Sequence, residues 1–315
     1  MPSIFSDRKK VWLVLPGGGV RGAFQIGFLK TFLYRFPHLV IDRTFGTSVG
    51  SLIGPMVKAG KIDKVLAIFQ DLDSPTKVFD SYSLVEKRFP VIPLLFRNSA
   101  FKRIHLVDKI AAELGSDFDY SDCNCVAWDL MYKKATWFKG DRYINGMHAS
   151  SALPMALPPY RLNETMYVDG YVTQLLPLDD IYQQFKECSY RDDVTILIVD
   201  CSTRIPLSMK DNNPSIFTIM GEVMSDATMH SSNRDLSTFQ QNLPHVHYIK
   251  PNVTRFSSAM DFSSEKIKLS IADGCTIGNV WFPVDVSNPI VKSTVSTSGV
   301  ISNRQISAIY DVVSF

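Results

Sequence analysis

A strand that runs into a glycine-rich turn and then into a helix opens this chain, and it limits the choice of fold more than any other feature. Val11–Leu15 is an uninterrupted apolar run that stops at Pro16 and the three glycines Gly17–Gly19. Such a run is typical of a strand buried on both faces of a parallel sheet. From Gly22 to Phe36 the apolar residues recur at helical spacing, which predicts a helix directly after the turn.

The same unit then follows a second time. Ile41–Phe45 favours a short strand, Gly46–Gly50 a tight turn, and Ser51–Ala59 a helix of small residues. Parallel strands need a crossover connection, which is usually a helix. Two consecutive units of this kind therefore predict an α/β fold with a mostly parallel sheet.

The rest of the chain continues the alternation of helical and strand patterns. These patterns predict helices at residues 62–71, 105–114, 144–153 and about 215–230, and strands at 124–130, 134–138, 194–199 and about 245–249. Beyond about residue 277 the chain becomes rich in Ser, Thr, Val and Asn. We therefore expect one domain over residues 1–280 and a C-terminal extension over 281–315, either an edge hairpin on the same domain or an arm for a partner.

Composition and charge exclude several classes of function. Of the 315 residues, 45% are hydrophobic and 20% charged, as in globular proteins with a substantial core. The 33 basic and 31 acidic residues give a formal net charge of +2. A net charge this small creates no strong electrostatic field that would attract nucleic acid, so we expect no nucleic-acid partner. Any contact with an anionic membrane must be made by a local group of residues.

Cysteine spacing and the N-terminal segment predict a reduced protein without a membrane span. The five cysteines are scattered along the chain without the regular spacing of a disulfide framework. A metal site at Cys123 and Cys125 would need further ligands, and the sequence near them supplies none. The apolar run before Gly17 is too short for a signal peptide, and no stretch approaches the roughly 18 apolar residues of a bilayer span. We expect a cytoplasmic or peripheral membrane protein that binds no metal and no cofactor.

Ser48 is the first candidate for chemistry. Gly46-Thr47-Ser48-Val49-Gly50 fits Gly-x-Ser-x-Gly, the sharp strand-to-helix turn that exposes a nucleophilic serine at the head of a sheet. At Gly46 and Gly50 we expect a β-carbon to collide with the neighbouring strand or helix. The position between a predicted strand and a predicted helix is the context that this motif requires.

The first glycine loop is the candidate oxyanion site. Gly17, Gly18, Gly19, Arg21 and Gly22 lie between a strand end and a helix start, where amide groups can converge on an anion. A P-loop would need Lys followed by Ser or Thr after the last glycine, and the chain has Ala and Phe there. A dinucleotide fingerprint would need an acidic residue at the end of the next strand, where Phe45 stands. We expect Arg21 to brace the loop through hydrogen bonds to backbone carbonyls.

Asp169 is the candidate base for Ser48. None of the six histidines lies in the kind of late turn that supplies the histidine of an α/β-hydrolase triad, and we interpret His105 and His148 as structural. Asp169 follows a short apolar strand and precedes Gly170. We expect it at the carboxyl edge of the parallel strands, beside Ser48. Burial can raise the pKa of a carboxyl group toward neutral pH, where it can act as a base.

Together these segments resemble the patatin-like phospholipase family. The matching segments are the glycine loop with its arginine, the serine motif at Gly46–Gly50, Asp169-Gly170, and the segment from Ala149 to Pro159 that precedes the aspartate. They occur in the family's order over residues 11–170, and residues 264–274 are similar to the family's closing helix.

The resemblance implies a three-layer α/β/α fold and a Ser48–Asp169 dyad that hydrolyses fatty acyl esters through an acyl-enzyme, without a metal. The substrate class would be membrane phospholipid, cleaved by a phospholipase A or lysophospholipase type of reaction. The chain departs from the family at Tyr171, where Gly or Ala is usual, and this ring would narrow the substrate pocket.

Two other functions remain open at this point. One is a catalytically silent or partner-gated module that binds lipid or protein on the same fold, and the other is an esterase for small substrates, which Tyr171 would favour. The apolar residues 89–96, flanked by cations, favour either lipid contact or a buried loop. Head group, acyl length, oligomeric state and an activating partner leave no signal in the sequence.

Overall fold

A sheet of eight strands forms the centre of the molecule. The structure is a computed structural model, and it describes residues 10–80, 99–172, 178–202, 239, 242–243, 245–253, 255–256 and 258–281. The spatial order is β10 (Val246–Ile249), β9 (Val194–Val199), β1 (Lys10–Leu15), β2 (Val40–Thr47), β5 (Cys123–Asp129), β8 (Thr165–Asp169) and β7 (Tyr160–Leu162), and β6 (Lys134–Phe138) also pairs with β5. The pairings from β10 to β5 are parallel, whereas β6 and β8 pair antiparallel with β5, and β7 with β8. The predicted mostly parallel sheet is confirmed.

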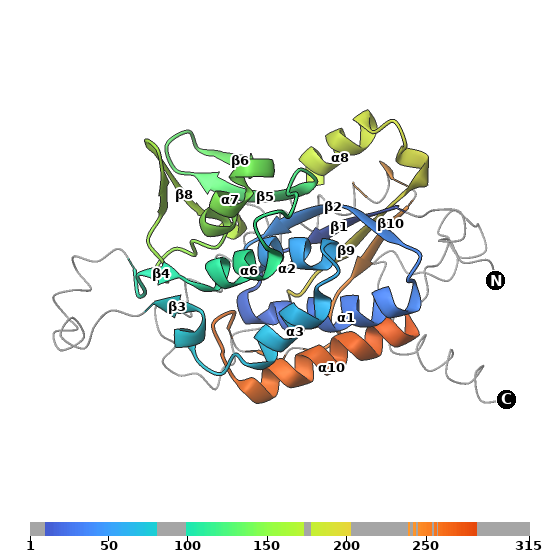
Figure 1. Ribbon diagram of the computed structural model, residues 1–315, viewed down its shortest axis with the longest axis horizontal. Coiled ribbons are helices and arrows are strands. Elements are labelled where there is room, and N and C mark those ends of the chain that lie inside the picture. The colour runs from blue at the N-terminus through green and yellow to red at the C-terminus, as the bar shows by residue number, and fades with distance from the viewer. Residues whose placement is uncertain are drawn as a thin grey trace.

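Helices cover both faces of this sheet, so the fold has three layers (Figure 1). One face carries α1 (Gly22–Arg35), α2 (Val49–Lys58), α3 (Ile62–Gln70), α6 (Leu106–Leu114), α7 (Tyr143–Ser150) and α10 (Ser264–Val280). The other face carries α8 (Leu178–Glu187). Strand β1 shows why both faces are apolar, because Val11, Leu13 and Leu15 join the first core while Trp12 and Val14 join the second.

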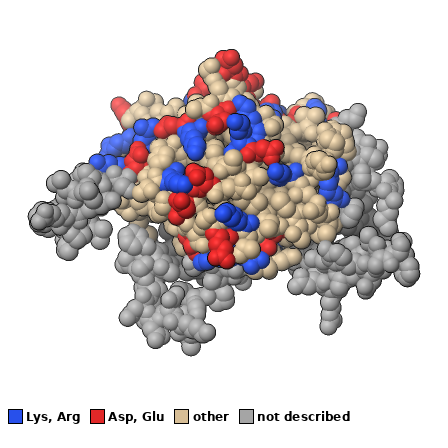
Figure 2. Space-filling view, turned by 60° about the horizontal axis from the view of Figure 1, so that its bottom comes forward, with Lys and Arg blue, Asp and Glu red and all other residues tan. Residues whose placement is uncertain are grey.

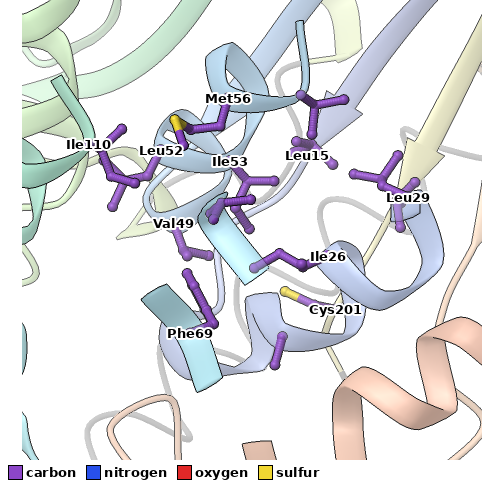
Figure 3. Close-up of a cluster of buried hydrophobic side chains, with 14 of the residues drawn as sticks. Leu15, Ile26, Leu29, Val49, Leu52, Ile53, Met56, Phe69, Ile110 and Cys201 are labelled. Atoms are coloured by element: carbon purple, nitrogen blue, oxygen red, sulfur yellow. The ribbon is translucent and has the colours of Figure 1, made fainter. Parts of the chain in front are cut away.

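The larger core lies between the sheet and the helices of the first face. Figure 3 shows part of this core, where side chains from several elements point toward one another: Leu15, Ile26, Leu29, Val49, Leu52, Ile53, Met56, Phe69, Ile110 and Cys201. Helices α1 and α10 pack closely, since a β-carbon at Gly274 would meet the backbone of Phe24 and Phe28. The closing helix that the resemblance implies is therefore present, and it covers the first helix of the chain.

Smaller elements complete the fold. Strands β3 (Phe79–Asp80) and β4 (Arg103–Ile104) form a separate antiparallel pair. Short 3-10 helices occupy Gly19–Arg21, Pro75–Lys77, Gly140–Arg142, Gly170–Val172 and Arg191–Asp193.

The predicted elements agree with this arrangement except at a few ends. Strand β2 extends two residues further than predicted, because Gly46 still pairs with Leu15 of β1. The helix predicted to Leu153 ends at Ser150, and residues 151–154 form the turn that approaches the site. The predicted helix at 215–230 and the apolar segment at 89–96 lie outside the described residues.

Candidate functional site

Ser48 occupies a strained turn between β2 and α2. Its backbone has φ 53° and ψ −126°, a region that non-glycine residues rarely adopt. A β-carbon at Gly46 would lie 2.5 Å from the Ser51 amide nitrogen, and one at Gly50 would collide with the Leu15 carbonyl. The expected need for glycine at both positions is confirmed, and the strain is concentrated on the candidate nucleophile.

Strands β2 and β8 bring Ser48 and Asp169 together end to end. Both strands pair with the same edge of β5, since β6 occupies the other edge: Thr47 lies beside Val126, and Asp169 beside Ala127. Asp169 lies at the expected edge, where β2 ends, although its own strand β8 runs antiparallel to β5. The two residues meet because β2 and β8 approach one another head-on, and the last residue of β8 stops where β2 ends.

The carboxyl group of Asp169 is buried, with 1% of the residue exposed. Burial raises the pKa of Asp169 to about 7 from its ordinary value of 3.8, and hydrogen bonding from the Ser48 side chain and the Tyr171 amide offsets part of the rise. The Tyr171 amide donates to Oδ1 over 2.9 Å. A carboxyl group that titrates near neutral pH can alternate between base and acid there.

Helix α7 and the turn after it hold both segments in place. The Ser48 amide donates to Ser150 Oγ at 2.8 Å, and the Asp169 amide donates to the Ala152 carbonyl at 3.0 Å. The Tyr143 hydroxyl donates to the Ser51 carbonyl at 2.8 Å, which ties α7 to the first turn of α2. Sequence analysis singled out this segment without giving it a role, because contacts 102 residues apart, such as Ser48 to Ser150, leave no local pattern.

The glycine loop lies next to Ser48, but only part of it can bind an anion through amides. The amides of Val20, Arg21 and Gly22 already donate to the carbonyls of Ala259, Gly18 and Gly19 respectively. Within the described part of the chain, the amides of Gly18 and Gly19 donate to no protein group, and both residues line the cavity in front of Ser48.

Gly17 plays a different part in this loop. A β-carbon there would lie 2.9 Å from the Ser48 β-carbon and 3.3 Å from the Tyr171 ring. Gly17 therefore lets the loop approach Ser48, and Gly22 begins α1 and packs against Val49. The structure thus brings together the five loop residues named from the sequence, and each of them makes different contacts.

Arg21 does not brace the loop in the expected way. Only 8% of the residue is exposed, and its buried Nε has no hydrogen-bond partner among the described residues. The side chain forms no hydrogen bond to a described carbonyl, and Arg21 lines the cavity together with Ser48. The structure therefore places in the wall of the site a largely buried arginine that forms no ion pair with a described residue.

The cavity beside Ser48 and Asp169 has a volume of about 490 Å3, and its wall is predominantly apolar. The apolar lining comes from α3, the β3–β4 pair, the turn after α7 and the segment before α10, and includes Phe69, Phe79, Phe101, Leu153 and Phe262. Tyr171 also lines this cavity, near the dyad. Such a volume and lining suit a ligand with a substantial hydrocarbon part.

Other candidate groups lie outside this site. Among the described residues no group of three or more metal-ligating side chains is present. His105 Nδ1 lies 3.0 Å from Asp80 Oδ1, and His148 Nε2 lies 3.4 Å from Asp108 Oδ1. All five cysteines are free thiols. No helix in the described parts of the chain has the length and apolar character needed to cross a bilayer.

The fold and this site define a mostly parallel α/β protein with a serine at a strained strand–helix turn, beside a buried aspartate and a glycine loop. The sequence profile of the family "Patatin-like phospholipase" matches residues 13–182. The chain therefore belongs to the patatin-like phospholipases, a family of lipid hydrolases, as the sequence motifs indicated.

Several individual proteins are similar to this chain. Uncharacterized NTE family proteins of Mycobacterium bovis (Mb1092c) and Mycobacterium tuberculosis (MT1093) are 25% identical over 176 residues, which cover 56% of this chain and 46% of theirs. The chain thus spans about half the length of the curated relatives it matches.

Two solved structures are similar at lower identity. VipD from Legionella pneumophila matches with a TM-score of 0.48 and 14% identity over 86% of this chain and 66% of that one. A chain of the complex of full-length SpcU with full-length ExoU from Pseudomonas aeruginosa matches with a TM-score of 0.28 and 15% identity, over 76% of this chain and 53% of that chain.

Proposed function

We propose that this protein is a serine lipid acyl hydrolase that cleaves fatty acyl esters of membrane phospholipids through a Ser48–Asp169 dyad. The observation that carries the proposal is the strained Ser48 backbone beside a buried carboxyl group whose pKa is raised to about 7. Strain of this kind is costly and is concentrated at functional sites. Membership of the patatin-like phospholipases supports the same reaction class.

In the proposed reaction the Ser48 oxygen attacks the ester carbonyl carbon while Asp169 accepts the hydroxyl proton. The carbonyl electron pair moves onto oxygen, and the amides of Gly18 and Gly19 bind the resulting oxyanion. Collapse breaks the bond to the alcohol, which takes the proton from Asp169 and leaves acyl-Ser48. Asp169 then takes a proton from water as the water oxygen attacks the acyl carbon. The second collapse releases the fatty acid and returns the proton to Ser48.

The cavity supports a phospholipid in preference to a small ester. Its apolar wall suits an acyl chain, and the Arg21 guanidinium in the same wall forms no ion pair with a described carboxylate. A buried cation without a counter-ion is unfavourable, so an anionic group of the substrate, such as a lipid phosphate, would complete the site. Tyr171 narrows the space next to Ser48 in this proposal, and substrates with bulky groups there should react slowly.

The first test is fatty-acid release from mixed phospholipid vesicles by the native protein, Ser48→Ala and Asp169→Asn. We expect both substitutions to reduce the rate at least about a thousandfold, because nucleophile and base act as a unit. Asp200→Asn is a matched control: Asp200 is also buried, with 2% exposed, and burial also raises its pKa, but it does not line the cavity. Circular dichroism of each variant would show that folding is retained.

The alternatives give different results in this assay. Fatty-acid release that persists in Ser48→Ala would refute the proposed dyad. Equal rates on phospholipid vesicles and on a short-chain soluble ester would favour the esterase. If the folded native protein released nothing from any lipid, with or without detergent, the silent or partner-gated module would replace the proposed enzyme, and an activating partner would become the object of the search.

A further inference from the structure

The turn between β5 and β6 exposes two large apolar side chains. Met131 is 56% exposed and Tyr132 is 71% exposed, whereas most large hydrophobic residues of the described chain are buried or half-buried. Single exposed apolar residues are common on protein surfaces, so exposure alone says little. Three further features of this turn point to a binding surface: its hydrogen bonds, its charges and its position in the fold.

Local hydrogen bonds hold the turn in one conformation. Asp129 is buried, with 2% exposed, and its Oδ1 accepts the amides of Met131 at 2.8 Å and Tyr132 at 2.9 Å. Lys133 closes the turn with φ 55°, in the left-handed region. The two apolar side chains are therefore presented by a fixed hairpin end and not by a loose loop.

Cations surround the exposed pair. Lys133 and Lys134 are both exposed, the Lys134 ammonium lies 5.6 Å from the centre of the Tyr132 ring, and neither lysine forms an ion pair with a described residue. Arg161 of β7 is also exposed and lies close by, because Arg161 pairs with Met166 and the Leu130 amide donates to the Met166 carbonyl.

The acidic side chains near this turn are fewer. Glu164 is exposed in the turn between β7 and β8, and the Asp129 carboxyl group is buried in its hydrogen bonds to the turn. Among the described residues of these two turns and of β7, the exposed cations are Lys133, Lys134 and Arg161 and the exposed acid is Glu164, although the whole chain carries only +2. The local charge is complementary to an anionic surface.

The turn lies at the same edge of the sheet as Ser48. Val126 of β5 pairs with Thr47, which precedes Ser48, and β5 then continues past that level toward Met131. At roughly 3.3 Å per residue, the end of β5 at Asp129 lies about 10 Å beyond Val126, and Met131 follows in the turn. In Figure 1, β5, β6 and β8 lie on the same side of the view as β3 and β4, which contribute residues to the cavity wall.

The opposite edge of the sheet also exposes apolar residues, but the described cations next to them form hydrogen bonds or ion pairs within the protein. Tyr34, near the end of α1, is 87% exposed. The adjacent Arg35 donates to the carbonyls of Gly278 and Trp281, and Lys30 pairs with Asp63. Tyr34 is therefore a matched control, because it is exposed at the edge away from Ser48 and the described cations next to it, Lys30 and Arg35, have partners.

We propose that the turn Met131–Lys134 is the contact by which this protein docks on an anionic phospholipid bilayer. Met131 and Tyr132 enter the headgroup region, where amphipathic aromatic rings are favoured, and Lys133 and Lys134 meet lipid phosphates. The purpose of this contact rests on the proposed function, since it brings the edge that carries Ser48 to the membrane.

The test measures vesicle binding by full-length Ser48→Ala protein, which does not consume the lipid in the proposed mechanism. Vesicles contain phosphatidylcholine with or without phosphatidylserine, and binding is followed by co-sedimentation at low and high salt. Three variants are compared in this background: Met131→Ser with Tyr132→Ser, Lys133→Glu with Lys134→Glu, and Tyr34→Ser. We expect the first two to weaken binding to anionic vesicles about tenfold or more, and Tyr34→Ser to leave it unchanged.

Binding through this turn should also fall with salt, because exposed charges are screened. The same substitutions placed in the protein with Ser48 intact should leave hydrolysis of a short-chain soluble ester unchanged. The docking proposal fails if the parent does not bind anionic vesicles, if both turn variants bind as well as the parent, or if Tyr34→Ser weakens binding equally. Loss of vesicle binding in the turn variants, together with no hydrolysis of any ester by the native protein, would retain the docking surface and refute the proposed enzyme.

Discussion

Asp169 lies in an environment very different from that of a carboxyl group in water. Its burial raises the pKa to about 7, and the partners that stabilise its charged form are the Ser48 side chain and the Tyr171 amide. As a proposed base it must lose its proton before it can accept one from Ser48. The fraction of competent enzyme therefore increases as pH rises through the pKa.

We expect kcat/KM for a non-ionisable ester to rise with pH to a plateau, with a midpoint near 7. The sign follows from the base role, because protonated Asp169 at lower pH cannot accept the Ser48 proton. Initial rates across about pH 5 to about pH 9 would measure this limb. A flat profile over that range, in protein that stays folded, would mean that another group accepts the proton.

Local geometry explains which site features could be predicted from the sequence. The need for glycine at Gly46 and Gly50 follows from a turn five residues long, so the motif itself carries it. The strain at Ser48 belongs to the same turn. In contrast, the hydrogen bonding of Arg21 depends on every neighbour that the fold places around it. The sequence predicted hydrogen bonds from Arg21 to backbone carbonyls, whereas its Nε has no partner among the described residues.

At the scale of elements, α7 and the turn after it connect the two residues of the proposed dyad. Ser150 accepts the Ser48 amide, and the Ala152 carbonyl accepts the Asp169 amide, so one short segment sets the spacing between nucleophile and base. Ser150 is fully buried, and without its hydroxyl the Ser48 amide would lose its partner. We propose Ser150 as a positioning residue.

We expect Ser150→Ala to lower kcat about tenfold with little change in KM, because a small displacement of Ser48 weakens proton transfer more than substrate binding. The midpoint of the pH profile should also rise, since Asp169 would lose part of the hydrogen bonding that lowers its pKa. Ser270→Ala removes another buried serine hydroxyl, on α10, and serves as the matched control. Equal losses in both variants would indicate a general effect on stability.

Element directions separate what the sequence predicted from what it did not. The βα units at the start of the chain were predictable because strand, turn and helix are each specified locally, as Val11–Leu15 and Gly22–Phe36 illustrate. The antiparallel course of β8 was not, because it depends on pairing with β5 about forty residues earlier. Asp169 therefore reaches the expected edge of the sheet from a strand whose direction the sequence did not indicate.

At the scale of the whole molecule, the described end of the chain closes the core against its beginning. Trp281 is 7% exposed and packs edge-on against Phe28 at 5.9 Å between ring centres, and its carbonyl accepts Arg35 Nη1 at 2.8 Å. We therefore propose that the domain includes Trp281, one residue beyond the boundary expected from the sequence. Figure 2 shows Lys and Arg interspersed with Asp and Glu on one face, as the small net charge suggests.

We expect Trp281→Ala to lower the free energy of unfolding by about 3 kcal/mol or more, because a large buried ring is lost from the contact between α1 and the end of α10. Removal of residues 283–315 should change it by less than about 1 kcal/mol if the extension is separate from the domain. Urea denaturation of both variants measures the two values. A larger loss on truncation than on Trp281→Ala would make the extension part of the core.

The way the glycine loop is braced determines when a growing chain can acquire its site. The Val20 amide donates to the Ala259 carbonyl, and α10, which covers α1, follows that residue. Synthesis proceeds from the N-terminus, so Ser48, Asp169 and the loop all emerge from the ribosome before Ala259 exists. A nascent chain therefore holds the reactive residues without the brace that shapes its oxyanion loop. The proposed lipid hydrolase therefore cannot complete its site until Ala259 and the residues of α10 have been synthesised.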